Sequence, residues 1–151
     1  MNYRFPTKED LLSEVVTSLY REAGEQIGRA TGDSDSVIGG LATYIRSNLT
    51  FVADHPRHVR AVMAVAANMR PANGPRGGED PFSAHLRELI ERGQATGEAA
   101  DVDAGVLAMT TRASVDAAAA RAACDPTADP RGHAEYLVTI VRRALQATEP
   151  R

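Results

Sequence analysis

Two side chains of this 151-residue sequence could form a nucleophile and its general base: Cys124, the single cysteine, and His133. A thiol becomes a nucleophile when a neighbouring base or a lowered pKa activates it, and a third group usually orients that base. Here Cys124 ends an alanine-rich run, no nucleophile motif surrounds it, and no orienting residue stands in a suggestive place. We therefore expect an inert thiol and a protein that is not an enzyme.

The sequence gives equally little support for a metal site or a phosphate-binding loop. His55 and His58 stand close to Asp54, but a structural or catalytic zinc site needs further ligands, and the sequence offers none nearby. The glycine-rich segment 73–78 is not a phosphate-binding loop, because no strand precedes it and no Gly-Lys-Ser/Thr follows. We predict no metal ion and no cofactor.

Lys8 is the third candidate. Pro6 ends any preceding helix, and Thr7 is a good N-cap for a new one. A cation in the first turn is unfavourable beside the helix dipole unless an anion such as phosphate docks there. On these residues alone, Lys8 is either a phosphate contact or a solvated surface side chain.

Composition restricts the class of protein. Aromatic residues make up 5% of the chain and hydrophobic residues 43%, which favours close-packed helices over a sheet. The formal net charge is −3 and the arginines are dispersed, so no basic stripe for nucleic acid is present. There is no apolar run of about 20 residues, which argues against a membrane protein. A single cysteine fits a reducing cytosol, and we expect a cytoplasmic protein.

Apolar residues recur at helical spacing along most of the chain, and no segment has strand character. The pattern predicts an all-α bundle of about six helices. The first three are expected at 8–30, 36–53 and 56–69, and the last two at 103–123 and 130–146. Between them, a fourth helix is expected to start at Asp80-Pro81 and to end at Gly93 and Gly97.

The opening residues resemble the end of the recognition helix, the turn and the start of the fourth helix in TetR-type transcriptional regulators. The positions that fit are Phe5, Thr7, Lys8, Glu9, Leu11 and Leu12, with Tyr3 as the second of two aromatics. Asn2 and Arg4 depart from the pattern, and the turn 97–101 resembles the acidic turn of the family. The resemblance implies that Tyr3 and Lys8 contact DNA phosphate.

In that family a three-helix reading head of about forty residues precedes this point, whereas here only Met1 and Asn2 stand before Tyr3. We therefore expect residues 1–6 to be a remnant of the recognition helix and turn, and 7–148 to form a ligand-binding and dimerisation domain. Operator DNA would be bound only through the missing head.

The resemblance also implies a TetR-like C-terminal fold, in which the last two helices of each subunit form a four-helix bundle in a homodimer. The middle helices would enclose a cavity for a small, mainly apolar effector. We chose candidate lining residues by face and segment: Tyr44, Asn48, Phe51, Met63, Leu86, Met109 and Ala113.

The expected function is thus the ligand-sensing and dimerisation body of a repressor that releases DNA when the effector binds. Two alternatives stay open at this point. One is a head-less helical partner that binds a ligand or dimerises without touching DNA, and the other is a small helical-bundle enzyme. Against the enzyme stands the lack of paired carboxylates or a metal-spaced His/Glu set.

Overall fold

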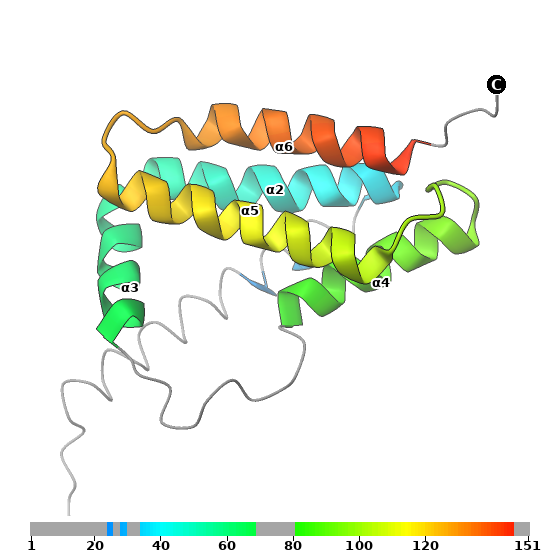
Figure 1. Cartoon of the computed structure of the whole chain (residues 1–151), viewed down its shortest axis with the longest axis horizontal. Coiled ribbons are helices and arrows are strands. Elements are labelled where there is room, and N and C mark those ends of the chain that lie inside the picture. The colour runs from blue at the N-terminus through cyan, green and yellow to red at the C-terminus, as the bar shows by residue number, and fades with distance from the viewer. Residues whose placement is uncertain (1–23, 26–27, 30–33, 69–80, 147–151) are drawn as a thin grey trace, which may run out of the picture.

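The computed structural model describes residues 24–25, 28–29, 34–68 and 81–146, and within them the chain forms helices and no strand. Figure 1 shows the five helices, which are α2 (Val37–Asp54), α3 (Pro56–Asn68), α4 (Pro81–Ala95), α5 (Ala104–Cys124) and α6 (Pro130–Leu145). The predicted all-helical architecture is confirmed for this part of the chain. Residues 24–25 and 28–29 are helical as well, inside the range expected for the first helix. The rest of that range, with Tyr3, Lys8 and the proposed boundary after residue 6, lies outside the described residues.

Local capping explains why the helix boundaries follow the sequence so closely. The Ser36 hydroxyl accepts a hydrogen bond from the Gly39 amide at 2.9 Å, which satisfies one of the free donors at the start of α2. Asp103 and Asp129 cap α5 and α6 in the same way. The break between α2 and α3 falls at His55, immediately before Pro56, because the residue before a proline disfavours helical geometry.

The hydrophobic core lies around α2, which packs against α6, α5 and α4. In Figure 1, α2 lies beside α6 and α5, and α4 packs against α5 at the lower right of the view. The largest side chains with almost no exposed surface come from α2, α4, α5 and α6; they are Leu41, Tyr44, Ile45, Leu49, Leu86, Ile90, Thr111 and Leu145.

Gly93 does not end the fourth helix as expected, because α4 continues through it to Ala95. Its backbone lies against Val37 of α2, and a Cβ atom at this position would collide with the valine side chain. Gly97 does fulfil the prediction: it has a φ of 75°, the left-handed conformation that commonly follows a helix. The Glu98 amide then donates back to the Gly93 carbonyl at 2.8 Å.

The turn after α4 ties three helices together. The Glu98 carboxylate accepts from the Val37 amide at 2.7 Å, so it caps α2 from a distant part of the chain. The Ala100 amide donates to the Leu145 carbonyl at the end of α6 at 2.9 Å. This segment therefore fixes α4 relative to both α2 and α6.

Helix α5 is apolar on two opposite faces. Its inner face buries Ala108, Thr111, Val115, Ala118 and Ala119 in the core. A second set of apolar residues (Val106, Met109, Ala113 and Ala117) lies on the other side and is exposed. In a helix of small apolar residues, periodicity alone cannot tell which face is inside. Among the described residues, no helix has the length and hydropathy needed to cross a bilayer.

Candidate functional site

The seven residues chosen from the sequence divide into two groups. Tyr44 and Leu86 are fully buried, and Asn48 and Met63 are partly buried. Phe51, Met109 and Ala113 are exposed on the outside of α2 and α5. The seven do not converge on one cavity in the described part of the chain, and whether any of them binds a ligand stays a prediction.

The interior group centres on Tyr44. Its side chain is 1% exposed, and its backbone carbonyl accepts a hydrogen bond from Asn48 Nδ2 at 2.8 Å. One side-chain N–H of Asn48 thus bonds to the backbone of its own helix, which orients the side-chain amide. These two candidate residues therefore lie one turn apart on α2, and the Asn48 side chain is bonded to the Tyr44 backbone.

Arg112 completes this polar cluster and was not among the predicted residues. One guanidinium nitrogen donates to the Tyr44 hydroxyl at 3.2 Å and lies 3.2 Å from an Asp116 carboxylate oxygen. The guanidinium also lies over the Phe82 ring, 4.9 Å from its centroid, in cation–π geometry. One clue was present in the sequence: Arg112 is the only charged residue between Asp103 and Asp116.

Phe82 connects this cluster to the helical residues at 24–25. A Cβ atom on Gly24 would lie 3.2 Å from the nearest ring carbon of Phe82, so the ring packs closely on the glycine backbone. Groups from α2, α4 and α5 and from the first expected helix therefore meet around Phe82 and Arg112. We name these four residues, Tyr44, Phe82, Arg112 and Asp116, the arginine cluster.

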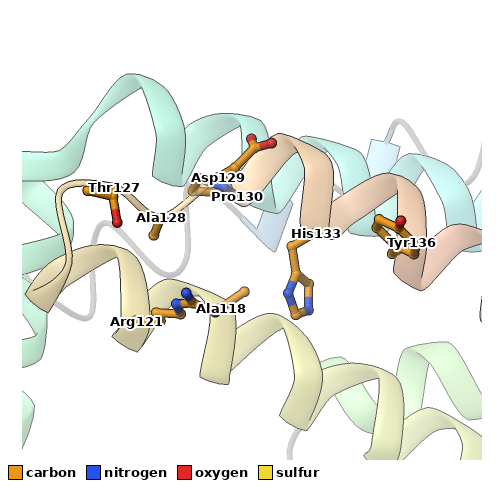
Figure 2. A pocket seen from close by; sticks show the side chains of 8 residues that line it. All are labelled: Ala118, Arg121, Thr127, Ala128, Asp129, Pro130, His133 and Tyr136. Carbon is orange, nitrogen blue, oxygen red and sulfur yellow. The ribbon is translucent and has the colours of Figure 1, made fainter.

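A second feature is a pocket of about 340 Å³ between the end of α5, the α5–α6 loop and the start of α6. Figure 2 shows His133 pointing from α6 toward α5, with Arg121 and Ala118 on the opposite wall. The remaining lining residues are Thr127, Ala128, Asp129, Pro130 and Tyr136. Tyr136 is 78% exposed, so the pocket opens to the outside.

The polar groups near this pocket have local partners. His133 Nε2 lies 3.1 Å from Ser114 Oγ, a contact that joins α6 to α5. Asp129 caps α6, and the Arg121 side chain lies 3.6 Å from Asp125. The Thr127 hydroxyl and then its amide, both donating to Asp125, hold the pKa of that carboxyl below its usual value. These contacts order the loop, and none of them requires a ligand.

The His55 and His58 pair is part of an aromatic row. The His55 ring stacks on Phe51 with centroids 4.4 Å apart, and the His58 ring meets His55 edge-on at 5.6 Å. Among the described residues, no group of three or more His, Cys, Asp or Glu side chains is arranged to hold a metal ion.

Comparison of the chain with protein-family models, with curated proteins and with solved structures found no match. The resemblance to TetR-type regulators therefore rests on the opening residues, on the turn 97–101 and on the order of the helices.

Proposed function

We propose that this chain is the ligand-sensing and dimerisation body of a TetR-like transcriptional repressor that acts in the cytoplasm. In a protein of this kind, DNA is bound by a helix-turn-helix segment, and an effector in the body changes the spacing of two such segments. The observation that carries the proposal is the second apolar face of α5, which continues onto α6.

This outer face is defined by Val106 and Met109 on α5 and by Tyr136 and Ile140 on α6. These four large side chains are between 53% and 78% exposed. A helix with a second apolar face normally buries that face as well, so α5 has the character of an interface helix. Small residues lie among them, including Ala113 and Ala117, which allow a second helix to approach closely.

The two helices present this face together. His133, Tyr136 and Ile140 follow one another at spacings of three and four residues along α6, so they share one side of that helix. The Ser114–His133 contact joins the same side of α6 to α5. A second copy related by a two-fold axis would place two α5–α6 pairs against each other as a four-helix bundle.

The arginine cluster supports the sensing half of the proposal. It gathers polar groups from α2 and α5 beside an aromatic ring of α4, which is the composition of small-molecule sites. It also reaches Gly24 through Phe82. A compound bound there would act on the helix that the resemblance places next to the DNA-reading segment.

Light scattering at tens of micromolar protein tests the dimer. We expect the wild-type chain to be dimeric, and we expect Met109→Lys and Ile140→Lys to be monomeric, since each puts a charge into the outer face. Thr139→Lys is the matched control, because Thr139 is the exposed neighbour of Ile140 on another side of α6. A monomeric wild-type chain would refute this part of the proposal.

A thermal-shift screen of small apolar compounds tests sensing, because a ligand that binds the folded state raises the Tm. On this proposal these 151 residues alone do not bind DNA sequence-specifically. A sequence-selective gel shift with this chain would overturn that assignment.

A further inference from the structure

The exposed side of α5 protrudes at the start of the helix and is recessed toward its end. Five residues at spacings of three or four form one row on this side, which we call the α5 stripe: Val106, Met109, Ala113, Ala117 and Ala120. The first two are large and are 53% and 60% exposed, and the other three are exposed alanines. The stripe therefore has large side chains in one half and small ones in the other.

Ala113 lies at the centre of the α5 stripe. Met109 and Ala117 are each four residues from it, and Val106 and Ala120 are each seven residues from it. In a two-fold contact, if residue i of one copy touches residue j of the other, then j also touches i. A two-fold axis beside Ala113 and perpendicular to α5 would therefore place Met109 against Ala117 of a second copy, and Val106 against Ala120. Each large side chain would meet a small one.

The charges on the outer side of α6 show the same mirror relationship. Asp129 precedes Tyr136 by seven residues and Arg143 follows it by seven, and all three are exposed. Seven residues are about two helical turns, so the three lie on one side of α6. Antiparallel copies of α6 would bring Arg143 of one copy opposite Asp129 of the other, whereas parallel copies would bring like charges together, which is unfavourable.

One axis can relate both helices to their copies. Ser114 is the neighbour of Ala113, and His133 is one turn before Tyr136. The Ser114 and His133 side chains lie 3.1 Å apart. The centres of the two mirror relationships therefore lie at a similar level along the α5–α6 pair.

The pocket of about 340 Å³ lies at the recessed end of this face. Ala118 and Arg121 form its α5 wall, as Figure 2 shows, and they are neighbours of Ala117 and Ala120 in the small half of the stripe. In the antiparallel arrangement, the protruding half of a second copy faces this pocket. In a parallel arrangement the two pockets would face each other and leave a large void, which well-packed interfaces avoid.

We infer that two copies of this chain pair with their α5 helices antiparallel, the large half of each α5 stripe lying against the alanine half of the other. The inference rests on the proposed dimer and adds its orientation and its contacts. It assigns to Met109 and Val106 the role of the protruding side chains, and to Ala117 and Ala120 the role of the surface that receives them.

Disulfide cross-linking measures the orientation. Every variant is the full 151-residue chain with Cys124→Ser, which removes the natural thiol, and is oxidised mildly at tens of micromolar. Ala113→Cys should cross-link to its own copy, because the axis passes beside it and a disulfide needs Cα atoms about 4.4–6.8 Å apart. Glu88→Cys, an exposed position on α4, is the control for random collision and should stay monomeric on a denaturing gel.

A mixture of two variants gives a second measurement of the orientation. Val106→Cys and Ala120→Cys should each fail to cross-link alone, because equivalent residues would be offset by about 21 Å along the antiparallel pair, at about 1.5 Å per residue. An equal mixture of the two, with one of them carrying a tag that changes its mobility, should give the mixed dimer. Cross-linking of Val106→Cys to itself would indicate parallel α5 helices, and cross-linking of Val106→Cys to Ile140→Cys would indicate α5 against α6 of the second copy. Either result overturns the inference.

An exchange of side-chain size tests the contact without cysteines. Met109→Ala leaves a gap opposite Ala117, and Ala117→Met places two methionines against each other, so each change should raise the dimer Kd by roughly tenfold or more. The double variant restores one large and one small residue at each contact and should dimerise within about threefold of the wild type. Sedimentation equilibrium gives the Kd of all four proteins.

The outcomes separate this inference from the proposed function. A dimeric wild-type chain whose Ala113→Cys variant does not cross-link, or whose Val106→Cys and Ala120→Cys variants do not cross-link in mixture, overturns the orientation and leaves the proposed dimer standing. Additive weakening in the Met109→Ala, Ala117→Met double variant also overturns it. A monomeric wild-type chain overturns both the orientation and the dimer.

Discussion

Val37 of α2 fills the space that Gly93 of α4 leaves open. The two residues are 56 positions apart in the sequence, and a side chain of any size at Gly93 would overlap the valine. The Val37 amide also donates a hydrogen bond to the Glu98 carboxylate. The contact therefore sets how closely α4 approaches the start of α2.

Gly93→Ala tests this contact. Alanine favours a helix over glycine by roughly 1 kcal/mol, but overpacking of a rigid interior costs about 1–3 kcal/mol and should win here. We expect a net loss of stability in urea unfolding. Gly28→Ala is the control, since a Cβ there meets no atom within 4 Å, and it should be neutral or stabilising. A Gly93→Ala protein as stable as the wild type would contradict the close approach.

Tyr44→Phe removes the hydroxyl that accepts from Arg112 while keeping the shape of the buried ring. Because the partner is charged, we expect a loss of about 1–3 kcal/mol in the free energy of unfolding. Tyr136→Phe, at a tyrosine that is 78% exposed, should stay within about 0.5 kcal/mol of the wild type. Both are measured at one protein concentration. Equal effects of the two changes would argue that the Arg112 contact has no energetic weight.

The helices could be predicted because their signals are local. Ser36, Pro56 and the Asp129-Pro130 pair act within one turn, and each marks a helix boundary to within a residue or so of the observed position. Gly97 likewise ends α4 through its own backbone conformation. Capping and proline geometry depend on neighbouring residues, which a sequence shows directly.

Relationships between distant residues could not be predicted in this way. Arg112 and Tyr44 are 68 positions apart, and their contact depends on how α5 packs against α2. Gly93 was predicted to end its helix, but the reason for glycine there is the close contact with Val37 of another helix, which the sequence does not show. Met109 and Ala113 were chosen as cavity-lining residues but lie on the outside, because the alanine-rich sequence of α5 does not show which face the core buries.

Glu98 offers a test of capping from a distance. Glu98→Ala removes the acceptor for the Val37 amide and should cost about 0.5–2 kcal/mol, the usual range for loss of an N-terminal cap. Glu98→Gln keeps an acceptor and should lose less, because only the charge beside the helix dipole is removed. Asp101→Ala, an exposed acidic neighbour in the same turn, is the control. If denaturant unfolding shows that Asp101→Ala lowers the free energy of unfolding as much as Glu98→Ala does, the cap contributes little.

Arg46 and Glu135 join α2 to α6 through two hydrogen bonds of 2.7 Å each. The hydrogen bond from Arg46 holds the pKa of Glu135 below its usual value of 4.5, and the Glu135 contact raises the pKa of Arg46. Because the folded-state pKa of Glu135 is lowered, its contribution to stability is fully present above about pH 4.5 and disappears as the pH falls through the lowered value. Both side chains are largely exposed, so the contribution is small.

A double-mutant cycle of Arg46→Gln and Glu135→Gln measures this coupling directly. We expect a favourable interaction energy at pH 6 that shrinks steadily as the pH is lowered below about 4.5. The Arg131–Asp54 pair, which also joins α6 to the end of α2, stays intact in every variant. Urea midpoints of the four proteins at each pH give the interaction energy. A coupling that stays constant from pH 6 down to the acid-unfolding range would show that ionised Glu135 does not contribute through Arg46.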